Sequence, residues 1–260
     1  MPSPVPGTPQ LHVQAGRATI TLNRPDQHNR LQVEDLLVLQ RHFATVQADP
    51  SVRLLVLAAS GKSFCSGFHL GDFGQSPEAA SAGPQLFEQT VEALAALPLP
   101  TLCRLQGSVY GGATDLALAC DFRLGVRGML LRMPAARIGL HYYPSGLRRF
   151  VARLGLGAAK RLFLLAQDVP DHDLLAMGYL DQLAADLPAL DAQLQALADA
   201  LLANAPLAVQ GMKAALDEIA RGDAHLATLR EREARCAASA DLQEGLAALA
   251  QKRPAHFQGR

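Results

Sequence analysis

Two adjacent glycines at the start of an expected buried helix are the residues best suited to chemistry. Gly111 and Gly112 follow the apolar run 101–105, which is typical of a buried strand, and precede the small apolar segment 113–120. The first N–H groups of a helix have no partner within it, and together with the helix dipole they favour negative charge. Because Gly112 has no side chain, a ligand can approach this backbone closely. The pattern predicts a backbone donor for an oxygen that becomes negative during a reaction, although a tight turn made for packing alone explains the same residues.

Two other segments have the composition of site walls. Segment 60–73 is punctuated by glycine yet holds several large apolar side chains, which a polar surface loop does not need. Segment 133–146 is a long irregular connection that contains His141 and two of the four tyrosines, Tyr142 and Tyr143. Loops with such side chains are candidate binding walls.

The composition argues against several classes of partner. The chain has 260 residues with 24 basic and 24 acidic side chains, so it lacks the basic surplus that phosphate binding to nucleic acid requires. No apolar run approaches the ~20 residues of a membrane-spanning helix. The Pro-rich residues 1–9 lack the basic and apolar regions of a signal peptide. We therefore expect a cytoplasmic protein without a nucleic-acid or membrane partner.

The four cysteines and eight histidines show no metal-site spacing, so no metal is predicted. Neither the phosphate-binding pattern GxxxxGK[ST] nor a GxGxxG after a strand occurs, which disfavours nucleotide cradles of those kinds.

The order of apolar patterns predicts an α/β core followed by a helical region. Segments 11–15 and 17–22 predict a hairpin, 32–47 a helix and 52–58 a fully buried strand. Strands are also expected at 100–105, 121–125 and 130–133, a mobile segment at 76–83, and helices at 87–97, 146–153, 157–165, 171–177, 190–204, 206–221, 226–240 and 242–252. We divide the chain into a flexible leader at 1–9, an α/β core at 10–188 and a helical C-terminal region at 189–260. The helices of that last region are too apolar for an isolated module, so they should pack on the core or on a partner subunit.

Four segments in order resemble the crotonase (enoyl-CoA hydratase/isomerase) superfamily. They are Leu22–Asn29, Phe64–Leu70, the Gly111–Gly112 helix opening and Lys252–Phe257. The resemblance covers nearly the whole chain. It implies a ββα spiral core, a C-terminal helical trimerisation region, acyl-CoA thioester substrates, and a homotrimer or a hexamer made of two trimers.

The resemblance also implies a mechanism in which two backbone N–H groups stabilise the negative oxygen of a thioester enolate. Carried onto this chain, these donors are the amides of Phe68 and Gly112, with Asp115 and Tyr142 as candidate catalytic side chains. The candidate contacts to substrate or coenzyme A are Arg24, Ser66, His69, Leu70, His141, Tyr143 and Phe257. No cofactor is implied beyond the coenzyme A of the substrate.

The departures from the family pattern leave the reaction open. Hydratases of this family resemble one another in using two glutamates, where this chain has Asp115 and Ala135, and Ala135 cannot transfer a proton. An enoyl-CoA hydratase/isomerase-type activity is the first hypothesis. A decarboxylase or thioester hydrolase using the same oxyanion hole, assisted by Tyr142, is the second, and a catalytically weakened acyl-CoA-binding member is the third. Each candidate also has a structural interpretation: Asp115 as a helix cap, Tyr142 as a buried tyrosine, and Arg24 as a solvated charge.

Overall fold

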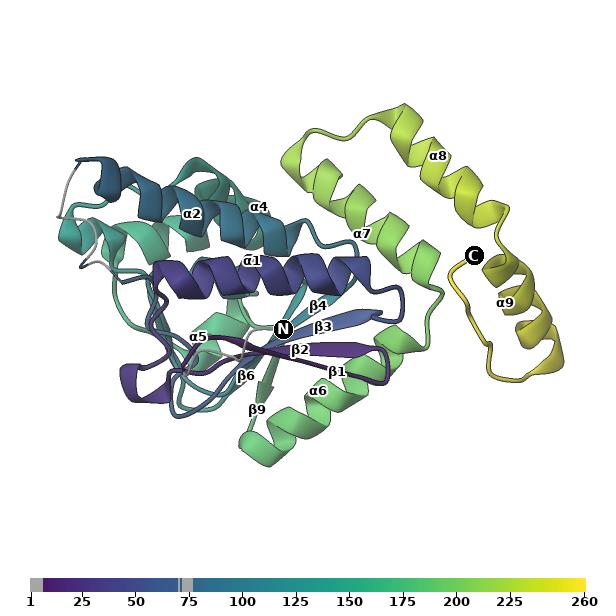
Figure 1. The fold of residues 1–260 in the computed structure, drawn as a ribbon, viewed down its shortest axis with the longest axis horizontal. Helices are drawn as coiled ribbons and strands as arrows, with labels where there is room; N and C mark the ends of the chain where they lie inside the picture. Colours follow the sequence, from purple (N-terminus) through teal and green to yellow (C-terminus); the bar gives the residue numbers. More distant parts are fainter. Residues whose placement is uncertain (1–6, 70, 72–76) are drawn as a thin grey trace.

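The centre of the computed structural model, which describes residues 7–69, 71 and 77–260, is a six-stranded sheet with helices on both faces (Figure 1). The strand order is β1-β2-β3-β4-β6-β9. β1 and β2 form the antiparallel hairpin expected from the sequence, and the remaining neighbours are parallel. The strands are β1 Gln10–Gln14, β2 Arg17–Leu22, β3 Leu54–Ala59, β4 Thr101–Leu105, β6 Phe122–Val126 and β9 Gln182–Ala184.

The fully apolar strand β3 is covered on both faces, as its sequence predicts. On one face lie α1 (Val33–Ala48), α2 (Pro77–Ala95) and α4 (Pro144–Lys160) (Figure 1). The opposite face is covered by α6 (Leu187–Leu202), whose Leu190 and Leu194 pack on the sheet in a second apolar cluster. α6 therefore packs as part of the sheet-containing core. The boundary expected near residue 188, between the α/β core and the helical C-terminal region, falls at the start of this helix.

A smaller three-stranded sheet, in the order β5-β7-β8, stands beside the main one. Its strands are short, namely β5 Val109–Tyr110, β7 Leu130–Arg132 and β8 Val169–Pro170. The buried helix α3 (Ala113–Leu118) follows β5, and α5 (Asp171–Ala176) follows β8. This arrangement sets the Gly111–Gly112 corner between a strand and a buried helix, as the sequence predicts.

The last three helices form an arm to one side of the sheet (Figure 1). They are α7 (Pro206–Arg221), α8 (Leu226–Ala237) and α9 (Ala240–Gln251), and the chain ends beside α9. Several large apolar side chains of the arm are exposed, including Leu226 and Leu249.

Two expectations need correction. Residues 77–83, expected to be mobile, form the first turns of α2, which continues through Pro84. Thr8 and Pro9, which were expected to belong to a flexible leader at 1–9, are buried, and the carbonyl of Pro9 lies 2.9 Å from His42 Nε2. Residues 1–6 lie outside the described residues. The break expected between helices 146–153 and 157–165 is present at Gly155, which has φ 78° inside α4.

Candidate active site

Main-chain hydrogen bonds hold the first glycine-bearing corner beside the second. The amide of Phe64 donates to the carbonyl of Ser108, and the amide of Tyr110 donates to the carbonyl of Cys65, both at 3.0 Å. Gly67, two residues after Cys65, has φ +93°. A Cβ added to it would lie 3.2 Å from the nitrogen of Gly112. Only glycine combines this backbone conformation with so close an approach. Gly67 therefore lies next to the Gly112 amide, and Phe68 is the residue that follows it.

Gly112 stands at the N-terminus of α3 with its side-chain position covered by Phe87. A Cβ at Gly112 would come within 2.7 Å of the Phe87 ring, so this residue must also be glycine unless Phe87 moves. The carbonyl of Gly112 accepts the amides of Asp115 and Leu116. Among the hydrogen bonds recorded for residues 7–69, 71 and 77–260, none uses the Gly112 amide as donor. At the first turn of α3 this amide has no acceptor within the helix.

Both corners open into one cavity of about 190 Å³. Its wall is mainly apolar and aromatic, which suits an acyl chain. The described lining residues are Ser66, Gly67, Phe68, Pro84, Phe87, Gly111, Gly112, Met133, Pro134, Ala135, Ile138, Leu140, His141, Tyr142 and Tyr143. None of these is a carboxylate.

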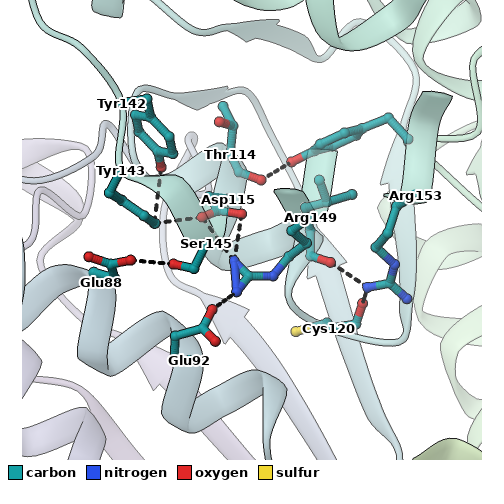
Figure 2. Close-up of polar contacts among 12 residues, drawn as sticks. Glu88, Glu92, Thr114, Asp115, Cys120, Tyr142, Tyr143, Ser145, Arg149 and Arg153 are labelled. Carbon is teal, nitrogen blue, oxygen red and sulfur yellow. Dashed lines mark hydrogen bonds and ion pairs between the residues drawn. The ribbon is translucent and has the colours of Figure 1, made fainter. Parts of the chain in front are cut away.

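Asp115 lies behind this wall rather than on it. It is 0% exposed in the first turn of α3, and it is held from two sides. Arg149 Nη1 of α4 contacts both carboxylate oxygens, at 2.9 and 3.0 Å, and the hydroxyl of Tyr143 donates to Oδ2 at 2.5 Å (Figure 2). The guanidinium compensates the buried negative charge that the helix terminus alone would not offset. Among the described residues, Asp115 contacts the cavity wall through the hydroxyl of Tyr143.

The two tyrosines form a stacked pair in the cavity wall. Their ring centroids are 4.2 Å apart, and the hydroxyl of Tyr142 donates to that of Tyr143 at 3.1 Å (Figure 2). Gly146 in the first turn of α4 makes room for this arrangement. A Cβ there would lie 2.5 Å from the Tyr142 ring and 2.7 Å from Asp115 Oδ2.

Burial dominates the acid–base properties of this group. It raises the pKa of Asp115 above its ordinary value, while the positive charge of Arg149 opposes that rise. It also raises the pKa of Tyr142 and of Tyr143, and the Asp115 charge adds to both effects. Groups whose pKa values are shifted by burial and by a specific charged partner are found often at functional sites.

On the side away from the cavity, Arg149 reaches a second carboxylate. Its Nη2 contacts Glu92 of α2, so the guanidinium joins α2, α3 and α4 (Figure 2). Arg153, one turn further along α4, donates to the carbonyls of Leu118 and Cys120 at the end of α3. These two arginines fix α4 against α3 and thereby fix the tyrosines that precede α4.

Comparison with known proteins identifies the family. The family model described as enoyl-CoA hydratase/isomerase matches residues 12–260. The chain belongs to this family. The resemblance found in the four sequence segments is thereby confirmed.

Relatives within the family have different reactions in their names. This family member is 29% identical over 245 residues to the crotonyl-CoA hydratase of Syntrophomonas wolfei, covering 92% of this chain and 94% of that one. It is 28% identical over 256 residues to the 1,2-epoxyphenylacetyl-CoA isomerase of Escherichia coli, covering 96% and 97%. The solved structure of an enoyl-CoA hydratase/carnithine racemase from Magnetospirillum magneticum superposes with a TM-score of 0.90 at 29% identity, covering 97% and 96%. The expected crotonase-like fold is confirmed.

The residues expected at the site fall into three groups. The cavity wall contains Phe68, Gly112, Ser66, His141, Tyr142 and Tyr143, together with Ala135, where the family resemblance implied a glutamate in hydratases. Asp115 contacts this wall from behind, and the ring of His69 lies beside Gly71 without lining the described part of the cavity. Leu70 lies outside the described residues.

Two residues expected to contact coenzyme A have other neighbours in this chain. Arg24 donates to the buried carboxylate of Asp35 at 3.0 Å, which gives it a structural ion pair at the start of α1. Phe257 packs near Gly245 of α9, on the C-terminal arm.

No signal in the sequence indicated that Arg149 or Glu92 lies at the candidate site. Arg149 lies in a helical pattern with several other arginines, and Glu92 lies on the expected helix 87–97. Both act at Asp115 only because the fold brings α2 and α4 onto α3. A buried acidic residue in a short apolar helix, which must find a cation, is the signal that could have prompted a search for such a partner.

Within the described residues no group of His, Cys, Asp and Glu side chains is arranged to hold a metal ion. In the same part of the chain no helix combines the length and apolar character needed to cross a membrane.

Proposed function

We propose that this family member acts on an acyl-CoA thioester and stabilises its enolate with the amides of Phe68 and Gly112, in an activity of the enoyl-CoA hydratase/isomerase type. The observation that carries the proposal is the convergence of two glycine-bearing corners on one apolar cavity. Removing a proton next to a thioester carbonyl moves negative charge to the carbonyl oxygen. Two fixed N–H donors stabilise that charge more than they stabilise the neutral carbonyl, and this difference lowers the barrier.

The cavity wall favours a proton shift over hydration by two carboxylates. Ala135 cannot activate water, and Asp115 is screened from the described cavity by Tyr143. A proton shift between carbon atoms needs only one group that takes up a proton and returns it. We assign that exchange to Asp115 acting with Tyr142. The chemistry needs no cofactor beyond the coenzyme A that forms part of the substrate.

The oxyanion donor can be tested by replacing Gly112 with proline. Gly112 has φ −57°, which proline adopts, so Gly112→Pro removes the N–H while keeping the local backbone. Because any Cβ at this residue meets Phe87, both Gly112→Pro and the matched control Gly112→Ala are made with Phe87→Ala. The alanine control retains the amide. The two variants therefore differ in the N–H donor of residue 112 and in the volume of the proline ring.

The assay follows turnover of short- and medium-chain 2-enoyl-CoA and 3-enoyl-CoA substrates, with acyl-CoA binding measured separately. We expect kcat of the proline variant to be lower than that of the alanine control by about 10²–10³-fold. Equal kcat values in the two variants refute the role of the Gly112 amide. Failure of the native protein to bind any acyl-CoA refutes the proposed function as a whole.

A second candidate is loss of carbon dioxide from a malonyl-type CoA ester, or hydrolysis of a thioester, in the same cavity. The lack of a carboxylate among the described lining residues favours it, because decarboxylation forms the enolate without a base and an apolar wall desolvates the departing carboxylate. Incubation with malonyl-type CoA esters, followed by measurement of carbon dioxide and free coenzyme A, distinguishes it from a proton shift. Tight acyl-CoA binding without turnover of any of these substrates indicates a catalytically weakened binding member.

We also propose that copies of this chain assemble into a homotrimer, or a dimer of trimers, through the C-terminal arm. The arm exposes Met212, Leu216, Leu226 and Leu249, each more than half accessible in the single chain. Exposed apolar side chains gathered on one part of a protein are typical of subunit interfaces.

A further inference from the structure

A continuous line of polar contacts links the cavity to the buried carboxylate. The hydroxyl of Tyr142 lies 3.1 Å from that of Tyr143, which lies 2.5 Å from Asp115 Oδ2. Both tyrosines line the cavity, whereas Asp115 is fully buried. The contacts therefore run from two residues of the cavity wall to a carboxylate that is buried behind them.

The chemistry of the three groups gives this line a direction. An ionised carboxylate can only accept hydrogen bonds, so the hydroxyl of Tyr143 must donate to Asp115. The oxygen of Tyr143 is then free to accept the proton of Tyr142. While Asp115 is ionised, the proton of Tyr142 is directed to Tyr143 and that of Tyr143 to Asp115, so the oxygen of Tyr142 keeps a lone pair that can accept a proton from the substrate.

We propose that Tyr142 and Tyr143 relay a proton between the α-carbon of the bound thioester and Asp115. In the forward step the C–H bond breaks, its electron pair forms the enolate, and the proton bonds to the Tyr142 oxygen. The former proton of Tyr142 moves to Tyr143, and that of Tyr143 moves to Asp115. Each tyrosine ends as a neutral phenol, Asp115 ends protonated, and the reverse sequence returns a proton to carbon. This inference rests on the proposed function.

The surroundings support a relay that ends on the carboxylate. Burial and the nearby Asp115 charge raise the pKa of both tyrosines, so neither holds the negative charge itself. Burial also raises the pKa of Asp115, which brings a weak carboxylate base closer to the working range of a general base. The assignment adds Tyr143, expected from the sequence only to contact substrate, to the residues that handle the proton.

Arg149 is a positioning residue for this relay. Its Nη1 contacts both oxygens of Asp115 and its Nη2 contacts Glu92, so it holds the carboxylate with Oδ2 toward Tyr143. The charged groups that act on Asp115 are Arg149 from α4, which lowers its pKa, and Glu92 from α2, which raises it. Neither residue lines the cavity, so both act only through Asp115.

The test measures exchange of the α-protons of butyryl-CoA in D₂O by mass spectrometry, because this saturated thioester can form an enolate but has no double bond to hydrate. The variant Tyr143→Phe removes one hydroxyl from the middle of the line. Tyr179→Phe is the matched control, since Tyr179 is a fully buried tyrosine whose hydroxyl donates to the carbonyl of Thr114 at 2.8 Å and does not line the cavity.

We expect Tyr143→Phe to slow exchange by about 10²–10⁴-fold, the usual contribution of a general acid–base group. Binding of butyryl-CoA should change little, and Tyr179→Phe should exchange at the native rate. Asp115→Asn should show the same loss, and the double variant Tyr143→Phe/Asp115→Asn should be no slower than either single variant, because the groups act in series.

Exchange by Tyr143→Phe at close to the native rate overturns the relay, and so do losses that multiply in the double variant. Binding of butyryl-CoA by the native protein without any α-proton exchange also overturns the relay, since no proton is then transferred from the α-carbon of the bound thioester. If the native protein does not bind butyryl-CoA or any other acyl-CoA, the failure lies with the proposed function instead.

Discussion

The buried ion pair between Arg149 and Asp115 gives the sharpest prediction about stability. Asp115 is 0% exposed and the Arg149 side chain is 10% exposed, so neither charge is well solvated. The substitution Arg149→Met keeps much of the side-chain volume but leaves the carboxylate without a cation. Removing one partner of a buried pair typically costs about 3–5 kcal/mol. We expect a loss of this size in the free energy of unfolding at neutral pH.

The loss should depend on pH with a definite sign. Burial already raises the pKa of Asp115 above the ordinary value of 3.8, and Arg149 is the main influence against that rise, so Arg149→Met raises it further. A carboxyl whose pKa is higher in the folded state binds protons preferentially there, so stability falls as pH rises from 3.8 through the folded pKa. The deficit of the variant should therefore shrink on acidification, when Asp115 becomes neutral.

Urea unfolding at pH about 7.5 and about 5 measures both effects, provided that the m-value is unchanged. The control Arg104→Met breaks the pair with Asp191, whose side chain is 60% exposed, and should cost about 1 kcal/mol or less. The double variant Asp115→Asn/Arg149→Met should recover part of the loss. A deficit that does not exceed that of Arg104→Met, or one that grows on acidification, contradicts the reasoning.

Three further predictions follow from the packing. Gly146→Ala places a methyl group 2.5 Å from the Tyr142 ring, so it should lower the free energy of unfolding by about 1–3 kcal/mol and abolish α-proton exchange. Exchange by this variant at the native rate would show that the tyrosine pair tolerates displacement. Leu249→Asp puts a charge on an exposed apolar side chain of α9 and should shift the mass measured by light scattering toward the monomer, while an unchanged mass excludes this residue from the interface. Burial raises the pKa of Cys65 to about 12, so iodoacetamide at pH about 8 should label the half-buried Cys236 first, and early labelling of Cys65 would contradict its burial.

Local signals in the sequence predicted one backbone feature of the candidate site, the turn at Gly111–Gly112 between a strand and a buried helix. The Gly111–Gly112 corner can be recognised from the sequence because the apolar strand before it and the small helical residues after it are close to it in the chain. The corner at Gly67 was not predicted from local signals, because the Phe68 amide was expected only through the family resemblance; Gly67 has the positive φ that glycine adopts readily. The α/β architecture likewise followed from the fully apolar strand β3 and its neighbours.

Side-chain roles that depend on distant segments could not be predicted in this way. Asp115 was expected in the cavity, but Arg149, which is 34 residues away, and Tyr143 enclose it. Arg24 was expected to contact coenzyme A or to be a solvated charge, and its hydrogen-bonded ion pair with the distant Asp35 was not predicted. Residues 77–83 were expected to be mobile because of their Ala, Ser, Gly and Pro content, yet they continue a helix whose later turns bury Phe87 and Val91. The amino-acid composition of a short segment does not indicate the tertiary contacts that stabilise it as a helix.

The C-terminal arm has a consequence for how the chain melts. α7 and α8 contain no buried residue, so in a single chain little apolar contact opposes the conformational entropy of these helices. The sheet and its covering helices, by contrast, enclose two apolar clusters. Heating a dilute sample should therefore give two calorimetric transitions, of which the first, the loss of the arm, moves to higher temperature as protein concentration rises.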